Sequence, residues 1–187
     1  MSKNLLRVIT GPNTRWSYAN VWEPKAINGG TPKYSVSLII PKDDVKTVNA
    51  IKEAIEAAYN EGQMKLKGSG KMVSPLAAIK KPLRDGDEEK PDDPTYKNCY
   101  FINANNVNKP DIVDTNGQYI IDRSEVYSGV YGRVSISFYA FNTNGNKGIA
   151  CSLGNLQKVK DGEHLGGKIS AAQDFASLDE DDEVIFG

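Results

Sequence analysis

Residues 130–141 combine aromatic, cationic and hydroxyl side chains in a two-residue repeat. In a β-strand this repeat places one set of small and apolar residues toward a core: Val130, Val134, Ile136, Phe138 and Ala140. The opposite face carries three aromatic rings, an arginine and two serines: Tyr131, Arg133, Ser135, Ser137, Tyr139 and Phe141. Rings of this kind stack on unpaired nucleic-acid bases at about 1–3 kcal/mol each, and cations contact phosphate. The strand therefore predicts a single-stranded nucleic-acid-binding face, although core packing explains any single ring equally well.

A second segment, residues 14–23, has a similar character, with Arg15 beside Trp16 and Tyr18. Its alternation predicts Trp16, Tyr18 and Trp22 on one face of a strand, and we assign Trp22 to the core before the other two. Basic residues elsewhere could extend a track for phosphates: Lys33, Lys80, Lys81 and Arg84.

An acidic run at residues 85–93 suggests a rival chemistry, in which Asp85 and Asp87 hold Mg²⁺ for phosphoryl transfer. A nuclease normally gathers its carboxylates from separate rigid elements. This run lies between Pro82 and Pro94 and is better explained as a solvated acidic loop.

Zinc chemistry and histidine-dependent catalysis are excluded by the scarcity of ligands. The two cysteines, Cys99 and Cys151, are far apart in the sequence, and His164 is the one histidine, in a glycine-flanked segment that suits a solvated linker. We expect no cofactor, no metal and no catalytic residue.

The charge is unevenly distributed along the chain. The protein has 23 basic and 24 acidic residues, but six of the acids and none of the bases lie in residues 171–187, which leaves +5 on residues 1–170. The small-residue composition of residues 167–187 predicts a flexible acidic tail after a domain at 1–166. Five consecutive carboxylates precede an apolar tip in this tail, which we expect to bind partner proteins through Asp179, Glu180, Asp181, Asp182, Glu183, Ile185 and Phe186.

The elements that must position these residues are mostly strands. Residues 5–10, 14–23 and 33–40 have β-strand patterns, and residues 43–62 have an N-cap, an apolar stripe and a terminal glycine typical of a helix. Further strands are expected at 98–107, 130–141 and 147–153, with tight hairpins at Asn116-Gly117 and Asn144-Gly145. The order predicts a mainly β fold, an OB-fold-like five-stranded barrel with one helix between strands 3 and 4 and with extra hairpins.

The sequence as a whole resembles a family of bacteriophage replicative single-stranded DNA-binding proteins. The segments that carry this resemblance are 17–24, 32–41, 82–87, 127–133 and 144–150, in order over nearly the whole domain. The resemblance implies an OB-fold, sequence-independent binding of single-stranded DNA (ssDNA) in phage replication and recombination, and no catalysis. The tail is similar to the acidic tips by which bacterial and phage ssDNA-binding proteins recruit replication enzymes, but it ends in Ile185-Phe186-Gly187 in place of Pro-Phe.

We hypothesise that a basic groove holds the DNA backbone and that the tail competes for this groove as a polyanion. The residues expected to stack bases are Tyr131, Tyr139 and one or both of Trp16 and Tyr18, and those expected to contact phosphate are Arg15, Lys33 and Arg133. The expected partners are ssDNA and replication or recombination proteins, with a homodimer possible. No membrane segment is expected, and the expected location is the cytoplasm of the bacterial host. A metal-dependent DNA-processing enzyme using Asp85 and Asp87, and a virion or structural protein that does not bind DNA, remain the alternatives.

Overall fold

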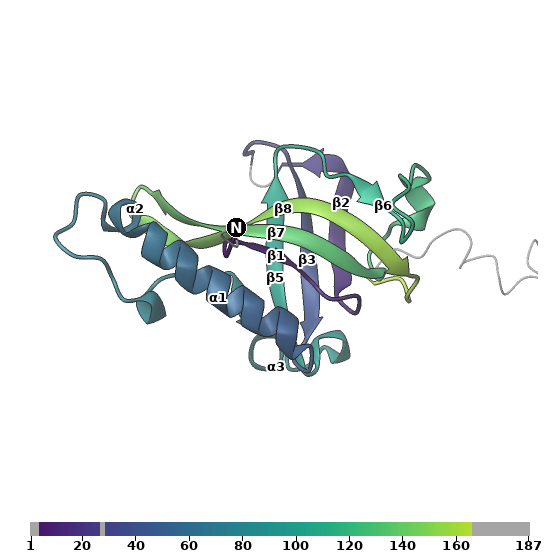
Figure 1. Cartoon of the computed structure of the whole chain (residues 1–187), viewed down its shortest axis with the longest axis horizontal. Helices are drawn as coiled ribbons and strands as arrows, with labels where there is room; N and C mark the ends of the chain where they lie inside the picture. Colours follow the sequence, from purple (N-terminus) through teal and green to yellow (C-terminus); the bar gives the residue numbers. More distant parts are fainter. Residues whose placement is uncertain (1–3, 27–28, 166–187) are drawn as a thin grey trace, which may run out of the picture.

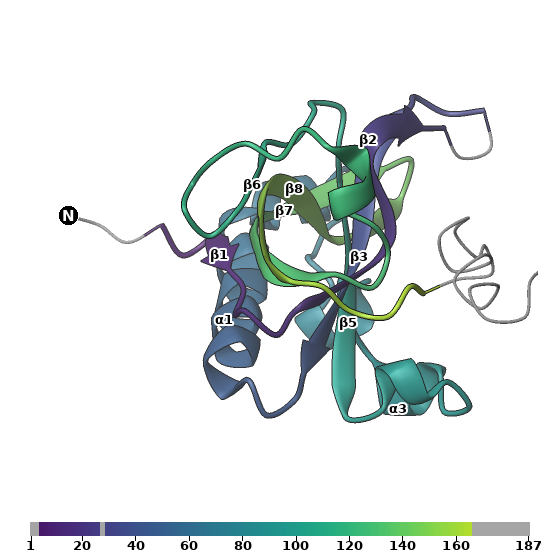
Figure 2. The same ribbon diagram turned by 90° about the vertical axis from the view of Figure 1, so that its right-hand side faces the viewer.

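The protein is mainly β, with five strands that close into a ring and one long helix packed beside them (Figure 1). The computed structural model describes residues 4–26 and 29–165. The ring strands are β2 (Arg15–Lys25), β3 (Lys33–Pro41), β5 (Cys99–Asn106), β7 (Tyr131–Thr143) and β8 (Asn146–Lys160). Each pairs with the next in the order β7-β2-β3-β5-β8, and the pairing of β7 with β8 closes the ring (Figure 2).

Three short strands lie outside this ring. β1 (Arg7–Ile9) pairs with β7, β4 (Leu83–Asp85) pairs with β5, and β6 (Ile112–Val113) pairs with β8. The sheet is mixed, because β8 runs parallel to both β5 and β6 while the other pairs are antiparallel. The prediction of a mainly β protein with one main helix is thus confirmed, and its assignment to the OB-fold stays a prediction.

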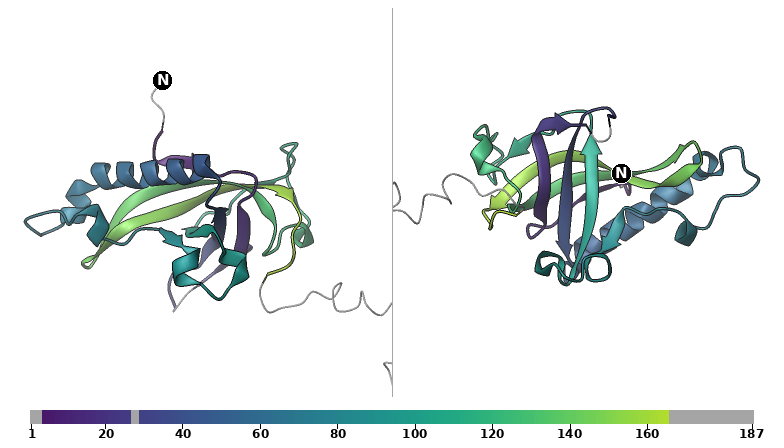
Figure 3. Two further views of the ribbon diagram at one scale, coloured as in Figure 1. Left: turned by 90° about the horizontal axis from the view of Figure 1, so that it is seen from below. Right: turned by 180° about the vertical axis from the view of Figure 1, so that it is seen from behind.

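Helix α1 (Val45–Glu61) forms where the sequence predicts it. The Asp44 carboxylate accepts a hydrogen bond from the Thr47 backbone N–H at 3.3 Å, and Gly62 ends the helix. Its apolar stripe is buried against β7, so that helix and β7–β8 hairpin extend together to one side of the ring (Figure 3). Along the chain the helix follows β3, as expected, but β3 is only the second strand of the ring because β1 lies outside it.

The hairpin between β7 and β8 turns at Asn144-Gly145, as predicted. Both residues have positive φ, 52° and 87°, which suits the twist of a two-residue hairpin. β8 is eight residues longer than its apolar pattern indicates and bends at two irregularities in its pairing with β7. The second predicted turn, at Asn116-Gly117, is also present, with Gly117 at φ 78° and a bridge between Val113 and Tyr119.

The segment between the helix and β5, where the sequence predicts neither a helix nor a strand, contains several short elements. It holds α2 (Gln63–Lys67), β4, α3 (Gly86–Glu89) and the single 3₁₀ turns Leu76–Ala78 and Pro94–Tyr96, and a third such turn, Arg123–Glu125, precedes β7. None of the helices in the described part of the chain is long and apolar enough to cross a membrane.

Candidate nucleic-acid interface

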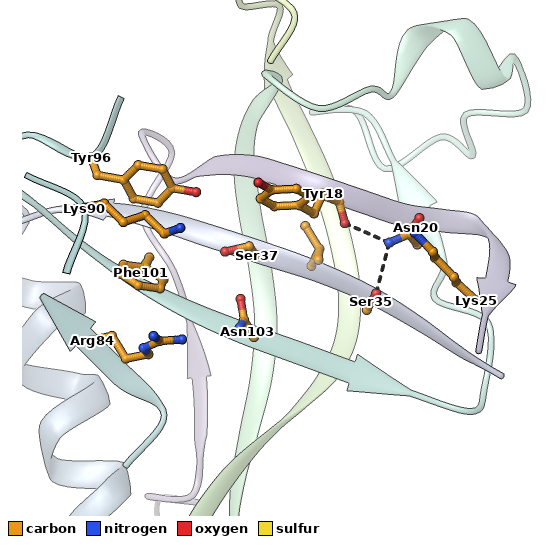
Figure 4. Close-up of a pocket in the computed structure, with 11 residues that line it drawn as sticks. Tyr18, Asn20, Lys25, Ser35, Ser37, Arg84, Lys90, Tyr96, Phe101 and Asn103 are labelled. Atoms are coloured by element: carbon orange, nitrogen blue, oxygen red, sulfur yellow. Dashed lines mark hydrogen bonds between the residues drawn. The ribbon is translucent and has the colours of Figure 1, made fainter. Parts of the chain in front are cut away.

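A groove crosses the outer face of β2, β3 and β5, which is the face that points away from the core (Figure 4). We call it the β2–β3–β5 groove. Its volume is about 360 Å³, and its lining mixes aromatic, cationic and uncharged polar side chains: Tyr18, Asn20, Lys25, Ser35, Val36, Ser37, Arg84, Lys90, Tyr96, Phe101 and Asn103. Among the residues that the structure describes, no carboxylate lines it. Such a surface suits an extended anionic ligand that also carries flat rings, because the cations attract its charges and the exposed aromatic side chain can stack on its rings.

Tyr18 is the exposed ring of this groove. Its side chain is 67% exposed, whereas Tyr96 and Phe101 are 4% and 2% exposed and form a wall and the floor. Tyr18 has φ 48°, and β2 carries one extra residue against β3 between Ser17 and Asn20. The bulge and the left-handed backbone together turn the Tyr18 ring out of the strand's regular alternation.

Cations surround the floor of the groove. The guanidinium carbon of Arg84 lies 4.8 Å from the Phe101 ring centroid, and the Lys90 ammonium lies 5.2 Å from Tyr96 and 5.7 Å from Phe101. Arg84 also forms a bidentate ion pair with Glu89, and this contact raises the pKa of the Arg84 guanidinium. Burial raises the pKa of Tyr96, so this phenol stays neutral at physiological pH.

Lys33, a predicted contact, lies at the end of the groove opposite Lys25. These two lysines are cross-strand partners of β2 and β3, and like charges in that position repel each other. Within residues 4–26 and 29–165, neither lysine forms an ion pair, and neither does Lys90. An anion bound between Lys25 and Lys33 would relieve their repulsion.

A second hollow of about 300 Å³ continues the groove past Tyr18 and Tyr96 and is lined also by Ser17, Asp93, Thr95, Ser128 and Leu165. Leu165, the last residue described, packs against the cluster of Ile39, Tyr96 and Phe101 beneath the groove. Its backbone N–H donates to the Ser128 carbonyl at 2.8 Å.

The prediction that Trp16 stacks on bases is wrong for this conformation. Trp16 is completely buried, and its indole N–H donates to the Gly132 carbonyl at 3.1 Å. Trp22, assigned first to the core, is instead half-buried, with its N–H bonded to the Val126 carbonyl and Lys109 near its ring. The bulge after Ser17 is the cause, because it breaks the alternation on which both assignments depended.

Arg15 and Tyr131 lie together, but beside the groove rather than in its lining. The Arg15 guanidinium donates to the carbonyls of Gly129 and Glu163 at 3.1 and 2.8 Å and lies 5.1 Å from the Tyr131 ring. Lys160 approaches the same ring at 4.7 Å. Arg15 therefore holds the chain after β8 in place, and its role as a phosphate contact stays a prediction.

The other predicted residues of β7 are separated from one another. Arg133 donates to the Thr10 carbonyl and lines a different hollow beside Arg7 and Asn155. Tyr139, 44% exposed, and the partly buried Phe141 lie on the outer side of the β7–β8 hairpin. Lys80 and Lys81 are exposed near that hairpin, and of the predicted basic track only Arg84 lines the groove and Lys33 borders it.

The carboxylates of the enzyme alternative are already satisfied by a lysine. Lys42 forms ion pairs with Asp85 and Asp87, both at 2.8 Å, and these contacts lower the pKa of both carboxyls and raise that of Lys42. Residues 85 and 87 belong to β4 and α3, not to the loop that was expected. Among the residues that the structure describes, no group of three acidic, histidine or cysteine side chains could hold a metal ion.

The predicted tail contacts all lie outside the described residues, so the partner-binding residues from Asp179 to Phe186 and the domain boundary at 166 stay predictions. His164 is exposed, as expected, and stacks on Tyr127 at 3.9 Å.

The sequence contained a signal for several groove residues that were not predicted. β5 alternates, with Ile102 and Ala104 in the core and Phe101 and Asn103 on the groove side. Applying the two-residue repeat to this strand would have found them. Lys90 and Tyr96, by contrast, reach the groove from the segment after β4, and no local pattern shows that.

Comparison with known proteins agrees with this geometry. A family model described as Enterobacter phage Enc34, ssDNA-binding protein, matches residues 6–185. The chain belongs to this family. The family is one of ssDNA-binding proteins and not of enzymes.

Two solved structures and one sequence relative are similar over most of the chain. The ssDNA-binding protein of bacteriophage Enc34 in complex with ssDNA is 26% identical, with a TM-score of 0.68, and covers 87% of this chain and 91% of its own. The ssDNA-binding protein gp2.5 of bacteriophage T7 shares the fold at 18% identity, with a TM-score of 0.58 over 94% and 95% of the two chains. A protein named p50 from Acyrthosiphon pisum secondary endosymbiont phage 1 is 28% identical, covering 92% of this chain and 96% of the relative.

Proposed function

We propose that this protein binds ssDNA without sequence preference in the β2–β3–β5 groove, during phage DNA replication and recombination. The observation that carries the proposal is the exposed Tyr18 ring in a groove whose described lining contains cations and no carboxylate, in a chain that belongs to an ssDNA-binding family. The related Enc34 protein, named for its complex with ssDNA, supports the same ligand.

Each part of the groove has a role in this proposal. A base stacks on Tyr18, and the phosphates on either side of it approach Arg84 and Lys90 at one end and Lys25 and Lys33 at the other. The uncharged side chain of Asn103 between them donates hydrogen bonds to sugar oxygens. Stacking and phosphate contacts do not depend on base identity, so the binding is sequence-independent.

We further propose that the acidic tail regulates this site. Leu165 packs beside the groove, and the acidic part of the tail, residues 174–187, begins only nine positions after it. Nine residues reach at most about 30 Å when extended, which is enough to cross the groove. The tail then competes with DNA as a polyanion and, once released, is free to recruit replication or recombination proteins.

Titration of a fluorescent oligo(dT) and of a mixed-sequence oligonucleotide, at two salt concentrations, tests the binding. We expect similar affinities for the two oligonucleotides and a steep weakening with salt, since bound phosphates release counterions. The absence of binding at low salt would refute the proposed function.

Deletion of residues 174–187 tests the tail. The truncated protein should bind more tightly than the full chain at low salt, and the difference should vanish at high salt as screening weakens the competition. Unchanged or weaker binding at low salt would refute the competition while leaving the groove intact.

A further inference from the structure

A second candidate surface lies on the outer side of the β7–β8 hairpin. Tyr139 and Phe141 are two residues apart in a regular part of β7, so their side chains lie on the same face. Between them, Ala140 faces the other way, toward Gly62 at the end of α1: a Cβ added to Gly62 would lie within contact distance of the Ala140 Cβ. The helix therefore covers one side of the hairpin and leaves Tyr139 and Phe141 on the other.

Lys80 joins these rings on the outer side. The Ile149 N–H donates to the Lys80 carbonyl at 2.8 Å, and Lys80 forms a bridge with Gly148, which is the partner of Phe141 in the hairpin. A Cβ built on Gly148 would lie 2.8 Å from the Lys80 Cβ and 3.0 Å from Phe141 Cε1. These short distances place the Lys80 side chain and the Phe141 ring over the same spot of the hairpin.

The chain connects this surface directly to the groove. Lys80 and Arg84 are four residues apart in a segment that pairs first with β8 and then, as β4, with β5. Four residues span at most about 14 Å. In this segment Lys80, Lys81 and Arg84 are all basic, and residues 62–84 contain six basic residues and no acid.

We infer that Tyr139, Phe141 and Lys80 form a second subsite for the same DNA strand after it leaves the groove past Arg84. Tyr139 offers a stacking face, and Lys80 and Lys81 lead the phosphates from one site to the other. This inference rests on the proposed function of the groove. Its consequence is that binding strengthens with strand length beyond what the groove alone can hold.

Oligo(dT) ligands of two lengths test the inference. One of about 5 nucleotides fits the groove alone, and one of about 16 nucleotides reaches both sites; these lengths lie near the two ends of the range that one ssDNA-binding domain covers. The Tyr139→Ala/Lys80→Ala variant should bind the long oligonucleotide about tenfold or more weakly than the wild type, and the short one equally well. The variant Lys46→Ala/Lys97→Ala removes two exposed lysines elsewhere and should change neither affinity.

The outcomes separate the two sites. No loss on the long oligonucleotide, or the same loss on both, would overturn the second subsite, whereas failure of the wild type to bind either ligand would overturn the proposed function itself. Tyr139→Phe, which keeps the ring, guards against a folding defect and should keep the wild-type affinity for the long strand.

Discussion

Replacement of Tyr18 should separate DNA binding from stability. In Tyr18→Ala the groove loses its exposed ring and keeps its backbone, so we expect a loss of about 1–3 kcal/mol of binding, roughly 5- to 150-fold in Kd. The side chain is 67% exposed, so the free energy of unfolding should change by no more than about 0.5 kcal/mol.

Tyr18→Gly should weaken binding by the same factor and also change stability. At φ 48° a residue with a Cβ costs about 1–2 kcal/mol, which glycine avoids. Glycine loses about 0.5–1 kcal/mol more conformational entropy on folding than alanine does. When the relieved strain and the entropy cost are combined, the free energy of unfolding of Tyr18→Gly should equal that of Tyr18→Ala or exceed it by up to about 1.5 kcal/mol.

Fluorescence anisotropy with labelled oligo(dT) and urea unfolding measure the two effects. Tyr119→Ala is the matched control, because Tyr119 is 68% exposed and lies outside the groove. Equal affinity of the Tyr18→Ala and Tyr119→Ala variants would refute the assignment of Tyr18 as the stacking residue. A Tyr18→Gly variant less stable than Tyr18→Ala would refute the account of the strained backbone.

Three further outcomes are expected. Lys25→Ala/Lys90→Ala should weaken ssDNA binding and reduce the slope of log K against log salt by about 0.7 for each phosphate that the variant no longer neutralises, measured over a salt series. Asp87→Asn should lower stability at pH 7. The Lys42 ammonium depresses the pKa of Asp87, so that stabilisation is present above about pH 4, the ordinary range of a carboxyl, and is lost as the pH falls. The thermal stabilities of variant and wild type should therefore converge as the pH falls below that range, and a constant difference would contradict the ion pair. Trp16→Ala should cost about 3–5 kcal/mol in urea unfolding, because the ring is wholly buried, and a mild effect would contradict its place in the core.

Local patterns predicted most of the fold correctly. The cap at Asp44, the apolar stripe of α1 and the glycine after it act within one or two turns, so the helix could be found from its own residues. The hairpin at Asn144-Gly145 was equally local, since the turn requires positive φ at both positions. The order of the elements predicted a barrel, but local patterns could not show which strands close it, because closure depends on pairing between strands that are far apart in the sequence, such as β5 and β8.

The candidate site was predicted in part for the same reason. Tyr18, Arg84 and Lys33 were expected as DNA contacts and lie in or beside the groove. Trp16 was misplaced because a bulge in β2 changes which side chains face outward, and no residue of the segment marks such a bulge clearly. Lys90 was missed because the structure between β4 and β5 brings it to the groove from a segment that looked like a loop.

Photochemical cross-linking tests the central claim most directly. An oligonucleotide with 5-iodouracil in place of thymine forms a covalent bond on irradiation with an aromatic side chain stacked on that base, and fragmentation of the linked peptide identifies the residue. We predict that the cross-linked residue in complexes with a short strand is Tyr18. A cross-link to Tyr119, or to Tyr131 beside Arg15, with none to Tyr18, would contradict the placement of the DNA in the β2–β3–β5 groove.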